Sequence, residues 1–147
     1  MFDRKIAHVF KTNENCQRLG QMAGVGPMIA TALVAAVKDA HEFSNGRHLA
    51  AWLGLVPRQH SSGGKPLLLG ISKRGDRYLR TLLIHGARAM VYRYRNSTED
   101  KASPIARWVQ QLIARRGVNC ATVALANKMA RQAWVILNRG ECYEPNA

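Results

Sequence analysis

MAGVGPMIATALVAAV, residues 22–37, joins a glycine-rich turn to an apolar run of helical length. Pro27 suits the first turn of a helix, because its missing N–H group is not needed there. Gly24 and Gly26 permit positive φ and leave the N–H groups of the turn uncovered by side chains. Together with a short helix ahead of the turn, the segment predicts a helix-hairpin-helix element over about residues 17–38.

This predicted element has the chemistry to hold a phosphate. The uncovered N–H groups lie beside the positive end of the second helix, and both attract an anion. Such a contact would bind the backbone of a nucleic acid without reading its sequence. Gly24 and Gly26 are therefore candidate nucleic-acid contacts, although a tight turn between two helices with no ligand fits the same pattern.

The chain on either side of this element is also helical in pattern, and strand-like alternation is nearly absent. Ser44 and Asn45 can cap one helix, and Ser103-Pro104 opens another that Gly117 closes. The fold class predicted is all-α, a compact multi-helix domain. One predicted helix outside the helix-hairpin-helix element runs from its caps Ser44 and Asn45 through Trp52, and the others cover about residues 2–11, 73–95, 103–116 and 120–138.

Residues 57–71, PRQHSSGGKPLLLGI, are rich in glycine, proline and serine, and this composition predicts an extended Ser/Gly loop. A hydroxyl beside glycines is accessible, and Arg58 and Lys65 could hold a phosphate next to it. Serine is a weak nucleophile until a base or metal activates it. On spacing alone, a flexible connector is the default interpretation of Ser61 and Ser62.

A basic run follows in residues 70–80, GISKRGDRYLR, at the predicted start of the helix 73–95. Cations there oppose the helix dipole, so local stability does not explain them, whereas phosphate contact does. A solvated basic face is the alternative. The candidate phosphate contacts of this run are Lys73, Arg74, Arg77 and Arg80, and the charge continues through His85, Arg88, Arg93 and Arg95.

The charge balance of the 147-residue chain narrows the class of partner. Twenty-two Lys and Arg against nine Asp and Glu give a formal charge of +13, which favours a polyanion such as nucleic acid. No apolar run approaches the roughly 20 residues of a membrane span. The three cysteines form no C-x-x-C pair and the acidic residues are scattered, so we expect no metal site and a cytoplasmic location. Trp52, Trp108 and Trp134 are expected to be core residues.

Three segments together carry a resemblance to a known family. AGVGPMIATALVAAV, FSNGRHLAAWLGLVPRQHSSGGK and GISKRGDRYLR with LLIHGARA resemble the C-terminal domain of the Piv-related DEDD insertion-sequence transposases, also called the insertion sequence one-ten family. Arg115-Arg116-Gly117 and residues 123–131 are similar to the end of that domain. Residues 1–22 resemble the end of a helical linker with the first hairpin helix, and residues 23–147 the transposase domain.

The resemblance implies DNA recombination by a serine nucleophile, which maps to Ser62, with Ser61 as the fallback. It implies DNA and a guide (bridge) RNA as partners and a homo-oligomer in the intact protein. Family members carry a preceding RuvC-like domain whose carboxylates bind Mg²⁺. We find no match to that domain in this sequence, so we expect a truncated or split transposase, inactive alone and without its own cofactor. The competing possibility is that the sequence is a partial reading frame of a complete enzyme. A non-catalytic helix-hairpin-helix module that only binds DNA is the alternative.

Overall fold

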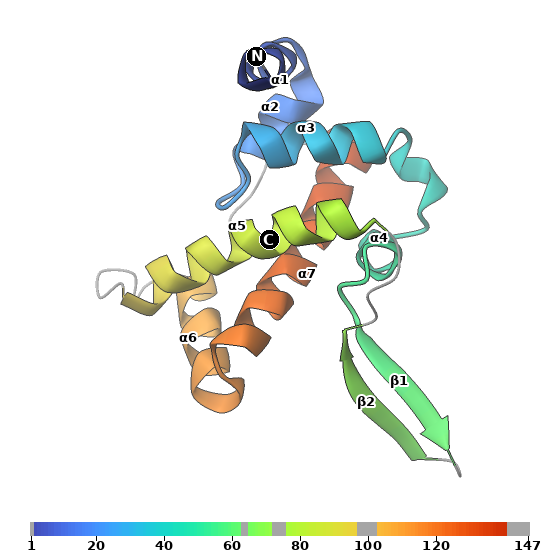
Figure 1. The fold of residues 1–147 in the computed structure, drawn as a ribbon, viewed down its shortest axis with the longest axis vertical. Helices are drawn as coiled ribbons and strands as arrows, with labels where there is room; N and C mark the ends of the chain where they lie inside the picture. The colour runs from blue at the N-terminus through green and yellow to red at the C-terminus, as the bar shows by residue number, and fades with distance from the viewer. Residues whose placement is uncertain (1, 63–64, 72–75, 97–102, 141–147) are drawn as a thin grey trace.

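The computed structural model describes residues 2–62, 65–71, 76–96 and 103–140 (Figure 1). Helices dominate these ranges, as the sequence predicts, and one two-stranded hairpin accompanies them. The elements are α1 (Phe2–Thr12), α2 (Glu14–Gly20), α3 (Pro27–Ala36), the 3₁₀ helix η1 (Ala40–Glu42), α4 (Gly46–Trp52), β1 (Pro57–Ser62), β2 (Lys65–Ile71), α5 (Arg77–Asn96), α6 (Pro104–Arg116) and α7 (Val118–Arg139).

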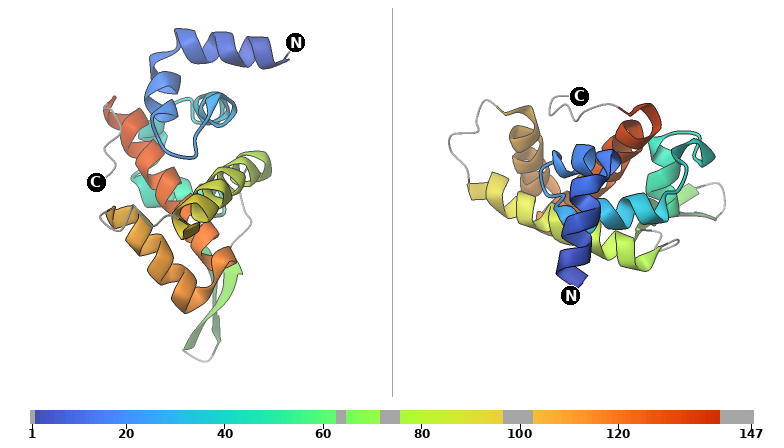
Figure 2. Two further views of the ribbon diagram at one scale, coloured as in Figure 1. Left: turned by 90° about the vertical axis from the view of Figure 1, so that its left-hand side faces the viewer. Right: turned by 90° about the horizontal axis from the view of Figure 1, so that it is seen from above.

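Helix α7 is the centre of the core. It packs against α2, η1, α4, α5 and α6, whereas α1 lies at one end of the molecule against α2 and α3 (Figure 2). Ala, Thr, Leu, Met and Ile side chains of α7 are buried from Ala121 to Ile136. The alanines among these buried residues are small and let neighbouring helices approach α7 closely. Among the described helices, none combines the length and apolar character needed to cross a membrane.

Helix boundaries follow the predicted caps. The Asn45 side chain accepts a hydrogen bond from the His48 N–H at 2.9 Å, and Ser103 Oγ accepts one from the Ala106 N–H at 3.4 Å. Each bond satisfies a donor that the first helical turn leaves unpaired. Gly117, with φ of 90°, separates α6 from α7 in a conformation that favours glycine.

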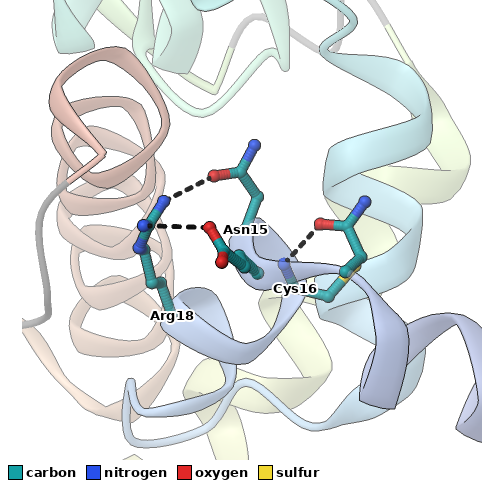
Figure 3. Close-up of polar contacts among 5 residues, drawn as sticks. Asn15, Cys16 and Arg18 are labelled. Carbon is teal, nitrogen blue, oxygen red and sulfur yellow. Dashed lines mark hydrogen bonds and ion pairs between the residues drawn. The ribbon is translucent and has the colours of Figure 1, made fainter.

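Polar side chains also fix the start of α2 (Figure 3). The Asn13 side chain accepts a hydrogen bond from the Cys16 N–H at 3.1 Å and so caps the helix. Within α2, Arg18 donates to Asn15 Oδ1 at 3.1 Å and pairs with Glu14 at 3.4 Å. The break between α1 and α2 is therefore confined to Asn13.

The prediction of a loop over residues 57–71 is wrong. Strands β1 and β2 pair antiparallel, with Ser62 opposite Lys65, His60 opposite Leu67 and Pro57 opposite Ile71. The register is irregular between Pro57 and Gln59. The overlooked signal is the pair Gly63-Gly64, which itself lies outside the described residues: two glycines between two extended segments favour a tight hairpin.

The three tryptophans differ in their surroundings. Trp108 and Trp134 pack against the core, as predicted. Trp52 does not, since 37% of its surface is exposed at the end of α4 and its ring meets Phe43 edge to face at 5.5 Å. The short α4 ends at Trp52, so no further turn of that helix follows to cover the indole.

We predict that Cys16 reports on the integrity of this core. Its side chain is fully buried, and burial raises the pKa of the thiol, so little thiolate forms near neutral pH. Iodoacetamide should therefore modify exposed Cys120 in the native chain and reach Cys16 only on unfolding. Peptide mass spectrometry across a urea series measures both rates. Equal labelling of the two residues in buffer would show that α2 is not packed as described.

Candidate functional site

The turn between α2 and α3 contains both glycines predicted to contact nucleic acid. Gly24 has φ of 85°, and a Cβ atom there would lie 2.9 Å from Met90 Cγ and 3.0 Å from Gly86 O. Conversely, a Cβ atom on Gly86 would lie 2.3 Å from Gly24 O. The two glycines therefore let the turn lie directly on α5, a structural reason for Gly24 that the sequence pattern did not reveal.

Gly26 has different surroundings. It is exposed, and a Cβ atom there would meet nothing within 4 Å. As the N-cap of α3 it offers no side-chain hydrogen bond to the first helical N–H groups. Helices α2 and α3 flank the turn, and Gly26 is the glycine whose surroundings leave room for a phosphate. The helix-hairpin-helix assignment and the phosphate contact stay predictions.

The root of the hairpin is fixed by the end of α4. Gly54 has φ of 75°, the Leu55 N–H bonds to Ala50 O at 2.9 Å and the Gly54 N–H bonds to Ala51 O at 3.0 Å. This is the Schellman pattern of helix termination, with a buried apolar residue, Leu55, after the glycine. Strand β1 begins two residues later, at Pro57, so the hairpin leaves the body from an ordered turn.

Ser62, the predicted nucleophile, is the last residue of β1 and pairs in register with Lys65, the first residue of β2. Ser61 pairs with Pro66, and Arg58 lies near the start of β1. The hairpin, in which Ser62 ends β1, extends away from the helices (Figure 1). The side chains of the hairpin, and all of Lys73 and Arg74, lie outside the described residues.

One face of α5 forms a continuous basic and polar surface, which we call the α5 stripe. At 100° per residue, six exposed positions fall within a sector of about 80°. They are Arg77, Thr81, His85, Arg88, Tyr92 and Arg95. Within the described ranges no carboxylate pairs with these arginines. Tyr78, 62% exposed, borders the stripe, and Tyr92 within it is 48% exposed.

Arg80 does not belong to this surface, which corrects its predicted role as an open phosphate contact. It is only 7% exposed. On the helix, Arg80 lies about 60° from Arg77, on the side that carries Ala87 and Val91. Those two residues are buried in the core, and the stem of Arg80 is carried inward with them. Arg77, by contrast, is exposed as predicted.

Three of the described carboxylates serve local structure. Asp76 Oδ1 accepts from the Leu79 N–H at 3.0 Å and caps α5, while Glu14 pairs with Arg18. Asp39 accepts from the backbone N–H and ring Nδ1 of His41, and these bonds lower the pKa of its carboxyl group. In the ranges described, no three His, Cys, Asp or Glu residues gather around a point. These carboxylates therefore do not suit the Mg²⁺ ions that the resemblance implies for the intact family members.

Comparison with known proteins identifies the family. The model of the transposase IS116/IS110/IS902 family matches residues 16–103, which include the turn, the hairpin and α5. The chain belongs to this family of transposases. It is 50% identical over 146 residues to the transposase for insertion sequence element IS1111A of Coxiella burnetii and 51% identical over 143 residues to a probable family 20 transposase of Pseudomonas aeruginosa.

One relative matches a smaller part of the chain. The pilin gene-inverting protein of Moraxella bovis is 34% identical over 74 residues, 48% of the chain. The match to the Coxiella burnetii and Pseudomonas aeruginosa proteins covers 99% and 97% of the chain but only 39% and 41% of those proteins. The chain thus spans about two fifths of their length, and α6 and α7 lie within the shared stretch.

We predict that Gly86→Ala separates the turn from α5. Because the new methyl group would overlap Gly24 O, it should lower the free energy of unfolding by about 3 kcal/mol. The corresponding fall in Tm is about 10 °C by circular dichroism.

Gly26→Ser is the matched control for this substitution. It adds a side chain in open space and supplies an N-cap hydroxyl, so it should leave Tm unchanged or raise it. A Gly86→Ala protein as stable as the parent would contradict the close approach of the turn to α5.

Proposed function

We propose that this chain is the nucleic-acid-binding part of an insertion-sequence transposase, that the α5 stripe binds a DNA backbone, and that Ser62 is the nucleophile of strand cleavage. The observation that carries the proposal is the α5 stripe in a chain whose relatives are transposases. The formal charge of +13 supports the same class of partner.

The dimensions of the stripe suit a nucleic-acid backbone. Arg77 and Arg95 are 18 residues apart, which is about 27 Å along a helix. This length matches about eight phosphate steps of duplex DNA at roughly 3.4 Å per step. Three exposed arginines along it offer forked donors, each able to bind a phosphate in a bidentate manner. Backbone contact of this kind provides affinity and orientation, without sequence specificity.

Arg77→Gln, Arg88→Gln and Arg95→Gln in one protein should weaken binding to a short DNA duplex. Each lost phosphate contact lowers the slope of log K against log salt by about 0.9, so we expect a decrease of about 2.7. Fluorescence anisotropy with a labelled duplex from 50 to 300 mM salt measures the slope.

A control with the same loss of charge carries Arg4→Gln, Lys5→Gln and Lys11→Gln, three exposed positions on α1. Its slope should change much less, since α1 lies at the far end of the molecule from the hairpin (Figure 1). An equal decrease in both proteins would mean that net charge, and not the α5 stripe, determines binding.

The proposed chemistry is attack of Ser62 Oγ on a phosphodiester. An Oγ–P bond forms, the P–O bond to one strand end breaks, the serine proton passes to a base and the departing oxygen takes up a proton. The product is a covalent protein–DNA link. Lys65 is the backbone partner of Ser62 in the hairpin register, and this pairing supports the proposal that its charge contacts the same phosphate. The groups that activate the hydroxyl are expected in the part of the longer relatives that this chain does not span.

Ser62→Ala, made with the chain joined to the rest of a full-length family transposase, should abolish the covalent link and cleavage while DNA affinity stays within about twofold. The physical reason is that the substitution removes the nucleophile but no positive charge. Denaturing gel electrophoresis of labelled DNA detects the link, and anisotropy gives the affinity.

Ser61→Ala is the adjacent control and should retain cleavage. If Ser61→Ala loses cleavage and Ser62→Ala keeps it, the nucleophile is Ser61. If both proteins cleave like the parent, the alternative function, a helix-hairpin-helix module that binds DNA without catalysis, is correct. The proposal also includes a guide RNA and a homo-oligomer for the intact transposase; co-purified RNA and the mass in solution test these two partners.

A further inference from the structure

One face of α7 holds the whole segment that leads into the hairpin. Asn127, Arg131 and Trp134 follow one another at helical spacing and face residues 40–55. Trp134 Nε1 donates to Ala40 O at 2.9 Å, and Asn127 Nδ2 donates to Leu55 O at 2.9 Å. Both carbonyl groups belong to buried residues. Ala40 O also accepts from the Phe43 N–H at 3.2 Å, whereas within the described part of the chain Asn127 is the donor found for Leu55 O.

Arg131 orients the amide of Asn127. Its Nε donates to Asn127 Oδ1 at 2.9 Å, and this bond assigns the oxygen of the amide to the arginine side. The amide nitrogen must then face Leu55 O, where it acts as a donor. Only one orientation of the Asn127 amide makes both hydrogen bonds, to Arg131 and to Leu55 O. These bonds define the position of Leu55 relative to α7.

Gly46 brings the other end of α4 equally close to α7. A Cβ atom on Gly46 would lie 3.0 Å from both Arg131 Cα and Arg131 O, so the backbone itself rests on that helix. With Gly46 at its start and Leu55 just beyond its end, α4 is fixed at both ends against five residues of α7, 127–131. Strand β1 begins only two residues after Leu55.

We propose that Asn127 is a positioning residue for the β1–β2 hairpin: through Leu55 O, and with Arg131, it sets the direction in which the hairpin leaves the body. Its importance for cleavage rests on the proposed role of Ser62; its effect on the hairpin does not. Asn127 lies 65 positions from Ser62 in the sequence and belongs to a different element.

Hydrogen exchange of the 147-residue chain tests the structural part. Asn127→Leu removes the donor to Leu55 O, and Asn127→Asp keeps an acceptor for Arg131 but sets a carboxylate against the carbonyl oxygen. Both should speed exchange of the amides of residues 55–62 and 65–71 by about tenfold, the equivalent of one buried hydrogen bond. Amides of α5 should change much less.

Trp134→Phe is the matched control, because it removes the neighbouring bond from α7 to Ala40 O and leaves the Leu55 contact in place. Trp134→Phe should lower Tm by about as much as Asn127→Leu does, but it should not speed amide exchange in the hairpin. Exchange in Asn127→Leu equal to that of the parent, or equal acceleration in Asn127→Leu and Trp134→Phe, would overturn the proposal.

The activity test uses the same substitutions in a full-length family transposase. With saturating DNA, Asn127→Leu should lower the rate constant of cleavage at least tenfold and change DNA affinity less than twofold, while Trp134→Phe keeps the parental rate. If Asn127→Leu lowered DNA affinity and left the rate constant of cleavage unchanged, the proposal that Asn127 positions the hairpin would be wrong. If the Ser62→Ala protein still cleaves DNA but Asn127→Leu speeds amide exchange in the hairpin as expected, Ser62 is not the nucleophile. The positioning of the hairpin by Asn127 is then still supported.

Discussion

Two side chains of helix α7 donate hydrogen bonds to the carbonyl groups of the buried residues Ala40 and Leu55, and for Leu55 O this is the donor found within the described part of the chain. A buried carbonyl without a partner costs free energy comparable to a lost hydrogen bond. Because the donors are Trp134 and Asn127 on one face of α7, they hold both ends of the segment with η1 and α4 against that helix. The hairpin starts from that segment, so a polar contact in the core decides where an exposed element begins.

Much of the helical body could be predicted because its signals are local. Asn45, Ser103 and Gly117 act within one helical turn of their own positions, and the structure places them at the expected boundaries. The hairpin was missed because glycine, proline and serine are common to loops and to tight turns. Only the exact interval, two glycines between two extended segments, distinguishes the turn.

The candidate site was predictable in its charge and less so in its geometry. Composition alone indicated a polyanionic partner, and the sequence of α5 indicated which helix carries cations. The sequence could not show that Arg80 is buried while Arg88 and Arg95 lie with Arg77 on the surface. That outcome depends on which side of α5 meets α3, α6 and α7. Likewise, Gly24 was expected to contact phosphate, and its contact with Gly86 depends on tertiary packing.

The length of β1 has a mechanical consequence. Five steps from Pro57 to Ser62 at about 3.3 Å each make an arm of about 17 Å. A tilt of about 10° at its base would therefore displace its far end by about 3 Å, as much as the whole separation between reacting atoms in a near-attack geometry. A rigid base therefore fixes the position of the far end of the hairpin, whereas a flexible base would let that end move over a wide range.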